Sequence, residues 1–180
     1  LLTLPLIFIF SFLILIFDLQ NPFFIQERSG IYGKSIKILK LQTMKYVNNK
    51  KKITKLGKLL RFSKIDELPQ LLSVIKNDMS LIGPRPLYID FNQHLKKNHS
   101  LSLSVKPGLT GLAQIKVNDS TDWKRKFNFD AIYTKKASFS LDIYIIIKTL
   151  IIIFNSIFLK NKRAIESIDY KKNFFDNYCK

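Results

Sequence analysis

The sequence has a single cysteine and few acidic residues, and the first shortage already excludes several kinds of site. Cys179, next to the C-terminus, is the only cysteine among 180 residues. A disulfide framework and a metal–thiolate centre are therefore excluded, and this cysteine usage fits a reducing compartment. A length of 180 residues predicts one domain, and a hydrophobic content of 47% is enough to form a core.

The second shortage leaves a large excess of positive charge. Only 13 Asp and Glu residues stand against 30 Lys and Arg, which gives a net charge of +17. This excess predicts an anionic partner: phospholipid, a phosphorylated ligand or nucleic acid. The bases are spread along the chain and no nucleic-acid-binding motif is recognisable, so we expect no nucleic acid partner. A non-catalytic basic protein that binds nucleic acid or anionic lipid is the alternative to an enzyme.

The first of two long apolar runs, LPLIFIFSFLILIF, covers residues 4–17. A helix of this length reaches about 21 Å, which is short of the ~30 Å hydrocarbon core of a membrane. No small-residue cleavage site follows the run, which argues against a signal peptide. It is the back half of a spanning helix, a re-entrant segment or a buried core helix. Since the chain starts at Leu1 rather than Met, we expect that its true N-terminus is missing.

The remaining segments predict a mixture of short elements. Residues 23–44 read as two short strands around a turn at Gly30–Gly33, and a lysine-rich stretch follows over residues 45–60. The second apolar run, residues 141–159, is interrupted by polar side chains, so we expect an amphipathic helix at a membrane interface rather than a spanning one. Residues 160–180 form a basic, polar tail.

The centre of the sequence combines a predicted helix with two adjacent carboxylates. The apolar face of this helix has the i, i+3, i+4, i+7 spacing at Leu68, Leu71, Leu72 and Ile75. Ser63 and Asp66 have the spacing of a capping box, which places Asp66 and Glu67 at the helix N-terminus. The positive end of the helix dipole favours ionised carboxylates there.

The acid pair has a chemical and a structural interpretation. An ionised carboxylate acts as a nucleophile or holds a hard cation such as Mg²⁺. Neighbours in a helix point about 100° apart, so we expect one acid to attack and the other to hold metal. The alternative is that both acids only complement the helix dipole. The turn Gly83-Pro84-Arg85-Pro86 favours chemistry, because prolines on both sides fix an arginine in a way that suits phosphate.

Two strings in the sequence resemble one known family. DELPQLLSVIKNDMSLIGPRP, residues 66–86, looks like the signature of the bacterial sugar transferases, which are small monotopic phosphoglycosyltransferases. KPGLTGLAQ, residues 106–114, is similar to a second element of that family. The resemblance implies a helix-rich α+β fold with short strands. It also implies a re-entrant membrane helix within residues 1–22, a catalytic domain over 23–159 and a tail over 160–180.

The resemblance also implies a set of site residues. The catalytic residues would be Asp66, Glu67 and Asp130. The phosphate or substrate contacts would be Arg61, Arg85, Lys40, Thr110 and Gln114. Glu67 would hold Mg²⁺, and Asp66 would be the nucleophile. An ordinary strand lysine at position 40 and a surface helix acid at position 130 are the alternatives.

The activity that the resemblance implies is the transfer of a phosphosugar from a UDP-sugar to polyprenyl (undecaprenyl) phosphate. UMP is released, a covalent aspartyl phosphosugar is the intermediate, and the reaction initiates assembly of a glycan such as O-antigen, capsule, exopolysaccharide or glycoprotein. The implied location is the bacterial inner (cytoplasmic) membrane, with the catalytic domain on the cytoplasmic face. Leu4, Gln42 and the stretch 116–118 depart from the family pattern, so a degenerate member is a further alternative.

Overall fold

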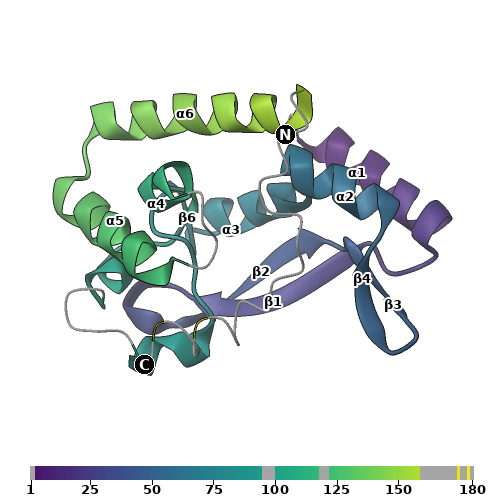
Figure 1. The fold of residues 1–180 in the computed structure, drawn as a ribbon, viewed down its shortest axis with the longest axis horizontal. Coiled ribbons are helices and arrows are strands. Elements are labelled where there is room, and N and C mark those ends of the chain that lie inside the picture. Colours follow the sequence, from purple (N-terminus) through teal and green to yellow (C-terminus); the bar gives the residue numbers. More distant parts are fainter. Residues whose placement is uncertain (1–2, 95–99, 118–121, 159–173, 175–177, 179–180) are drawn as a thin grey trace.

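The computed structural model describes residues 3–94, 100–117 and 122–158, together with Phe174 and Tyr178. Helices predominate among these residues and the strands are short, which confirms the expected helix-rich α+β fold. Figure 1 shows the long hairpin β1–β2 below helices α2 and α3, with α6 along the opposite edge and α4 and α5 at one end.

The elements follow one another in a fixed order along the chain. The helices are α1 (Leu4–Leu13), α2 (Lys55–Ser63), α3 (Leu71–Ile75), α4 (Leu112–Lys116), α5 (Trp123–Lys136) and α6 (Phe139–Phe158). The strands are β1 (Phe23–Ser29), β2 (Ser35–Leu41), β3 (Met44–Val47), β4 (Lys50–Ile53), β5 (Ser80–Ile82) and β6 (Gly108–Thr110). A π-helical turn η1 (Ile14–Asp18) extends α1, and the 3-10 helices are η2 (Ile31–Gly33), η3 (Ile65–Gln70), η4 (Ile89–His94) and η5 (Ser100–Ser104).

The hairpin β1–β2 confirms the predicted pair of strands in residues 23–44. Its register pairs Phe23 with Leu41 and Ser29 with Ser35, so the two strands match along their whole length. The turn closes at Gly33, whose φ of +74° lies in the left-handed region that glycine adopts without strain. The remaining strands form two smaller pairs, β3 with β4 and β5 with β6.

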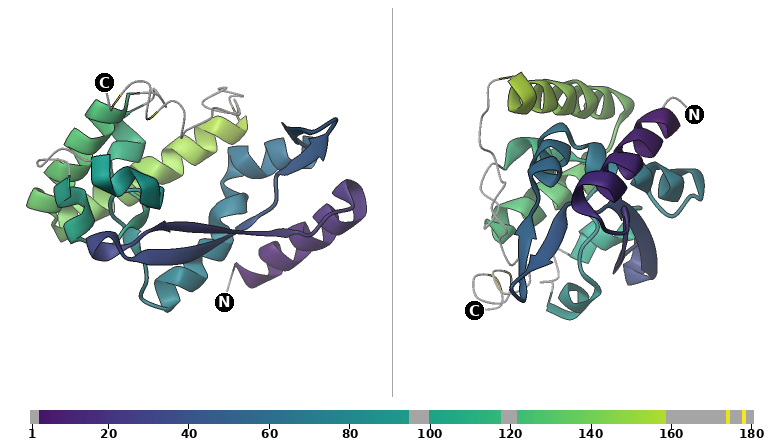
Figure 2. Two further views of the ribbon diagram at one scale, coloured as in Figure 1. Left: turned by 90° about the horizontal axis from the view of Figure 1, so that it is seen from below. Right: turned by 90° about the vertical axis from the view of Figure 1, so that its right-hand side faces the viewer.

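Helices α1 and α6 leave most of their apolar side chains uncovered. Phe8 in α1 is 75% exposed, so the interpretation of residues 4–17 as a buried core helix is wrong. In Figures 1 and 2, α1 lies at the outside of the fold and α6 runs along one edge. In the part of the chain that the structure describes, α6 alone is long and apolar enough to cross a membrane by length and composition. Its predicted position at a membrane interface stays a prediction.

The segment after α2 differs from the predicted amphipathic helix. Ser63 lies in the last turn of α2, where its Oγ donates to Leu59 O at 2.9 Å, so the capping box is wrong. Lys64 then adopts a left-handed φ of 59° and ends the helix. The chain restarts as the short 3-10 helix η3, which packs on β2. Residues 65–75 therefore do not share the single apolar face that one continuous α-helix would have. Leu72 is 42% and Ile75 is 77% exposed, so the predicted apolar face is not the buried one.

A close approach of three glycines brings the two recognised motifs together. A Cβ on Gly108 would lie 2.0 Å from Gly83 N, and one on Gly111 would lie 2.0 Å from Gly83 O. The backbone hydrogen bond from Gly83 N to Thr110 O, at 2.9 Å, joins the parallel strands β5 and β6. This contact fixes the Gly-Pro-Arg-Pro turn against the second motif, and with it the position of Arg85.

The largest core cluster is aromatic and includes two residues near the C-terminus. Phe91 stacks on Phe174 with ring centroids 3.7 Å apart, and both side chains are fully buried. Trp123, Phe127 and Tyr178 complete the cluster together with Leu87. Apart from Phe174 and Tyr178, the predicted tail lies outside the described residues.

Candidate active site

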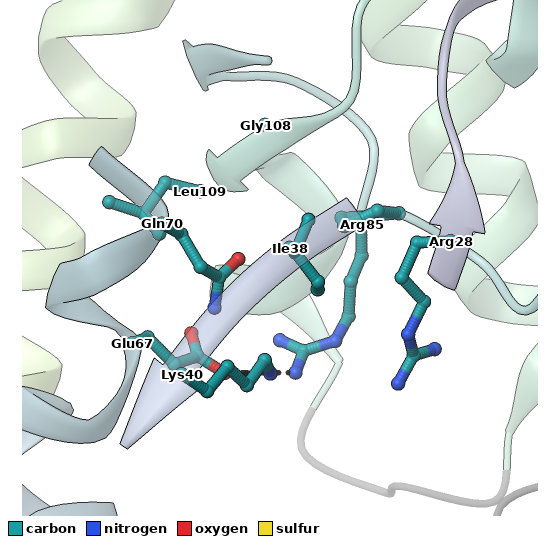
Figure 3. A pocket seen from close by; sticks show the side chains of 9 residues that line it. Arg28, Ile38, Lys40, Glu67, Gln70, Arg85, Gly108 and Leu109 are labelled. Atoms are coloured by element: carbon teal, nitrogen blue, oxygen red, sulfur yellow. Dashed lines mark hydrogen bonds and ion pairs between the residues drawn. The ribbon is translucent and has the colours of Figure 1, made fainter. Parts of the chain in front are cut away.

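Three side chains from separate elements meet at one carboxylate oxygen. Oε1 of Glu67, in η3, lies 3.3 Å from Nζ of Lys40 on β2 and 3.1 Å from Nη2 of Arg85 in the Gly-Pro-Arg-Pro turn. Figure 3 shows both cations reaching the Glu67 carboxylate. The side chains of Glu67 and Lys40 are only 13% and 16% exposed, whereas that of Arg85 is 49% exposed. Lys40, Glu67 and Arg85 were each predicted from the sequence as site residues, and the fold brings these three side chains together.

The charges at this point shift the pKa values of the two inner groups. Burial by itself would raise the pKa of Glu67, but the charges of Lys40 and Arg85 outweigh burial and hold the pKa well below its usual range. Burial lowers the pKa of Lys40, and the charge of Glu67 opposes that effect. Glu67 is therefore firmly ionised at neutral pH.

A small polar pocket opens beside this cluster. It is lined by Arg28, Ile38, Lys40, Glu67, Gln70, Arg85, Pro86, Gly108 and Leu109. These residues come from β1, β2, η3, the turn after β5 and the start of β6 (Figure 3). The pocket thus collects three cationic side chains and one carboxylate, which suits a ligand that carries several negative charges.

Asp66 lies next to Glu67 but in a different environment. Its Oδ1 is buried and has no hydrogen-bond partner. Burial and the charge of Glu67 raise the pKa of Asp66 to about 6, against the opposing charges of Lys64, Lys40 and Arg61. A pKa of about 6 still leaves Asp66 mainly ionised at pH 7, as expected for an acid at a helix N-terminus. Burial of the carboxylate in the six-residue η3 opposes that ionisation, which is why the pKa lies above its usual value.

Arg61 and Gln42 use their side chains within the protein. Nε of Arg61 donates to Oγ1 of Thr43 at 2.9 Å, and Arg61 influences Asp66 through its charge. Nε2 of Gln42 donates to the backbone oxygen of Met44 at 2.9 Å. Neither residue lines the pocket.

Thr110 and Gln114, the predicted nucleotide or sugar contacts, lie outside the pocket as well. Oγ1 of Thr110 is 2.7 Å from Oγ1 of Thr149 in α6, so this hydroxyl connects β6 to α6. Both polar side-chain atoms of Gln114 are buried without a hydrogen-bond partner. The structure therefore does not bring these two residues to the Glu67 cluster.

Asp130 is a buried acid of α5. It is only 4% exposed and its Oδ1 has no hydrogen-bond partner, so the alternative of a surface helix acid is wrong. Burial raises the pKa of Asp130 to about 7, and the charges of Lys126 and Arg85 oppose this rise. Asp130 thus senses the charge of Arg85, although it does not line the pocket.

Arg28 lines the pocket and was missed by the sequence analysis. Its guanidinium carbon lies 3.6 Å from the ring centroid of Tyr88. The alternation of strand residues relates Arg28 to Lys40 only once the pairing register of the hairpin is known. Arg28 pairs with Ile36 and Lys40 pairs with Phe24, so even-numbered residues of both strands share one face of the hairpin. That face carries both Arg28 and the predicted Lys40.

The acid pair fits a magnesium ion that is shared with a ligand. No group of three or more His, Cys, Asp or Glu side chains suited to a metal occurs among the described residues. Mg²⁺, however, is commonly held by one or two carboxylates together with substrate phosphates. The ionised Glu67 provides a carboxylate of this kind, and Asp66 beside it keeps an Oδ1 without a hydrogen-bond partner.

Comparison with known proteins agrees with the motifs. The family model described as "Bacterial sugar transferase" matches residues 1–156. The "Uncharacterized sugar transferase EpsL" of Bacillus subtilis (strain 168) is 38% identical over 153 residues, covering 80% of this chain and 76% of the relative. The "UDP-glucose:undecaprenyl-phosphate glucose-1-phosphate transferase" of Escherichia coli (strain K12) is 34% identical over 145 residues, covering 71% and 31%.

A further relative is the "Undecaprenyl-phosphate galactose phosphotransferase" of Salmonella typhimurium, which is 39% identical over 103 residues. The match covers 57% of this chain and 22% of that relative. The chain thus spans about three quarters of the Bacillus protein but less than a third of the two longer relatives. With the family model matched from residue 1 to residue 156, the chain belongs to the bacterial sugar transferase family.

Proposed function

We propose that this protein transfers a phosphosugar from a UDP-sugar to polyprenyl phosphate and releases UMP. The observation that carries the proposal is the pocket in which Glu67 gathers Lys40 and Arg85. Asp66, the neighbour of Glu67 in η3, does not itself line this pocket, and its buried Oδ1 has no hydrogen-bond partner. Such a pocket suits a diphosphate that is to be attacked at phosphorus. The names of two relatives specify undecaprenyl phosphate, and one of them specifies UDP-glucose.

Asp66 is the nucleophile in this proposal. A carboxylate oxygen of Asp66 forms a bond to the sugar-bearing phosphorus, and the bond from that phosphorus to the UMP oxygen breaks. UMP leaves with the electron pair, and a phosphosugar remains on Asp66. An oxygen of the lipid phosphate then attacks the same phosphorus and displaces the carboxylate. Burial without a hydrogen-bond partner suits attack, because no bond to Oδ1 has to be broken first.

The cations and Glu67 stabilise the phosphates. Lys40 and Arg85 already lie within 3.3 Å of an anionic oxygen, that of Glu67, and a phosphate oxygen would take up the same donors. Glu67 would hold Mg²⁺, which neutralises diphosphate charge when it is bound. Arg61 acts on Asp66 through its charge, and the buried Asp130 acts on Arg85 in the same way.

The lipid acceptor requires a membrane, and the exposed apolar helices supply the contact. We assign residues 1–22 to a re-entrant helix in the bacterial inner membrane, with the catalytic domain, residues 23–159, on the cytoplasmic face. Thr54 Oγ1 donates to the Asp18 carboxylate at 2.8 Å, and Lys45 Nζ donates to the Asp18 backbone oxygen at 2.9 Å. These bonds fasten the end of the membrane segment to β3 and to the residue that caps the N-terminus of α2. The lipid-linked product would initiate assembly of a glycan.

The test follows UMP release by the full chain in detergent with Mg²⁺, undecaprenyl phosphate and a panel of UDP-sugars. We expect release with at least one sugar and formation of a lipid diphosphate sugar. Folded protein that binds membranes but releases no UMP with any member of the panel would contradict the proposed reaction. A second measurement asks whether the protein stays with the membranes after a high-salt wash. A protein held by apolar helices should stay, whereas a purely electrostatic membrane binder is removed by salt.

A further inference from the structure

Arg28 is held beside the pocket by neighbours that do not neutralise its charge. Its guanidinium stacks on the Tyr88 ring at 3.6 Å, and its Nη2 donates to Oε1 of Gln26 at 2.6 Å. Gln26 Nε2 in turn lies 3.4 Å from the Tyr88 hydroxyl, which closes a small ring of contacts. The two partners fix the plane of the guanidinium, and both are uncharged.

The charge and one donor of Arg28 therefore remain available. Among the described residues, Arg28 forms no ion pair with a carboxylate, and its Nε is buried without a hydrogen-bond partner. Burial lowers the pKa of Arg28 to about 10, and the Tyr88 hydroxyl and the charge of Glu67 oppose this shift. A desolvated cation with an unused donor is stabilised by any anion that enters the pocket.

The position of Arg28 relative to the acid pair suggests which anion it meets. Arg28 and Lys40 lie on the same face of the hairpin, but the partner of Lys40 is Phe24, four residues from Arg28 along β1. Four strand residues span roughly 13 Å. In Figure 3 the guanidinium of Arg85 lies between the Glu67 carboxylate and Arg28. The pocket therefore offers Lys40 and Arg85 near the acids, and Arg28 farther away.

Displacement at phosphorus proceeds in line, so the leaving group departs on the side opposite the nucleophile. If Asp66 attacks one phosphate of a diphosphate, the second phosphate lies on the side remote from the acids, where Arg28 is. We propose that Arg28, oriented by Tyr88 and Gln26, binds the phosphate of the leaving nucleotide. This inference rests on the proposed function, since it requires a UDP-sugar donor from which UMP leaves. Arg28 lies outside both recognised motifs, residues 66–86 and 106–114.

The test measures binding of UMP and of uridine to the full-length protein in detergent. Because a hydrogen bond to a charged group is lost, we expect the Arg28→Gln substitution to weaken UMP binding by about 10- to 100-fold. Uridine, which lacks the phosphate, should bind both proteins equally. Arg28→Lys keeps the charge but not the planar fork, so it should fall between them. Arg125→Gln, on the exposed side of α5, is the matched control and should bind UMP as the wild type does.

A spectroscopic measurement separates direct contact from a structural role. The Nε–H resonance that disappears in Arg28→Lys identifies Arg28 in the ¹⁵N spectrum of arginine side chains. We expect UMP to shift this resonance and uridine to leave it in place. A resonance that UMP does not move, or an Arg28→Gln protein that binds UMP as tightly as the wild type, would overturn the assignment. If wild type releases UMP from a UDP-sugar in the same preparation, only the role of Arg28 fails; if it does not, the proposed function fails.

Discussion

Asp66 and Glu67 are consecutive residues of one 3-10 helix, and their surroundings shift their pKa values in opposite directions. Burial raises the pKa of Asp66 to about 6, whereas Lys40 and Arg85 outweigh burial and hold that of Glu67 well below its usual range. The partners explain the difference: Oε1 of Glu67 contacts two cations, and Oδ1 of Asp66 has no partner. The pair is thus divided into a fixed anion and a free carboxylate.

Replacing the free carboxylate should abolish the chemistry without unfolding the protein. We expect Asp66→Asn to reduce UMP release by at least about 10³-fold, because an amide is not a nucleophile of comparable strength. The melting temperature at pH 7 should be unchanged or slightly higher than that of the wild type, since a buried charge is removed. The exposed acid Asp78 provides the control, and Asp78→Asn should keep wild-type turnover. Normal turnover by Asp66→Asn would exclude it as the nucleophile.

Replacing the fixed anion should damage both stability and activity. In Glu67→Gln the largely buried Lys40 loses its carboxylate partner, which should lower the free energy of unfolding by about 1–3 kcal/mol at pH 7. A depressed pKa stabilises the fold above the unfolded value of 4.5, and this stabilisation is lost as pH falls through the folded pKa. The difference in unfolding free energy between wild type and variant should therefore shrink on acidification. Glu27→Gln, on the exposed side of β1, should show no such difference.

Ionisation of Asp130 should change the free energy of unfolding with pH in the opposite direction to Glu67. Its pKa is raised from 3.8 to about 7 in the fold, so the ionised form destabilises the protein. This cost is absent below pH 3.8, grows as pH rises and is complete above pH 7. We expect Asp130→Asn to be more stable than wild type above pH 7, by up to about 4 kcal/mol, and to lose that advantage near pH 4. Melting curves of both proteins across this range test it, and a pH-independent difference would contradict it.

The glycine contact between the two motifs should tolerate no side chain. A Cβ at position 111 would lie 2.0 Å from Gly83 O and 2.6 Å from Oε1 of Gln114. We expect Gly111→Ala to lower the free energy of unfolding by about 1–3 kcal/mol, because the backbone of β5 and β6 must move apart. The displaced Gly83 would carry Arg85 away from Glu67, so turnover should fall as well. Unchanged chemical denaturation would show that the contact is looser than described.

Local patterns in the sequence predicted the elements whose geometry is fixed by neighbours along the chain. The hairpin of residues 23–44 follows from alternating side chains and the glycines of its turn. The capping box at Ser63 did not form, because Lys64 ends α2 in a left-handed conformation that no spacing rule revealed. Leu72 and Ile75 are exposed, whereas Pro69 and Gln70 are the buried residues of η3, the segment that packs on β2.

The site was predictable where one motif carried the chemistry and not where the fold brought distant elements together. Glu67 and Arg85 come from one continuous string, and they do meet. Thr110, from the second motif, instead contacts Thr149 in α6, a partner that is distant in sequence. Arg28 lies opposite Ile36 in the hairpin, and the strand alternation that places it on the same face as Lys40 needs the pairing register, which the sequence alone does not supply.

The central claim is that Asp66 carries the phosphosugar, and mass spectrometry of the trapped protein tests it most directly. The full chain is incubated with the UDP-sugar that supports UMP release, without lipid acceptor, and is then quenched and digested. We expect the mass of one phosphosugar on peptide 65–76, lost on addition of undecaprenyl phosphate and absent in Asp66→Asn. An adduct on another peptide, or lipid product formed by Asp66→Asn at the wild-type rate, would contradict the account.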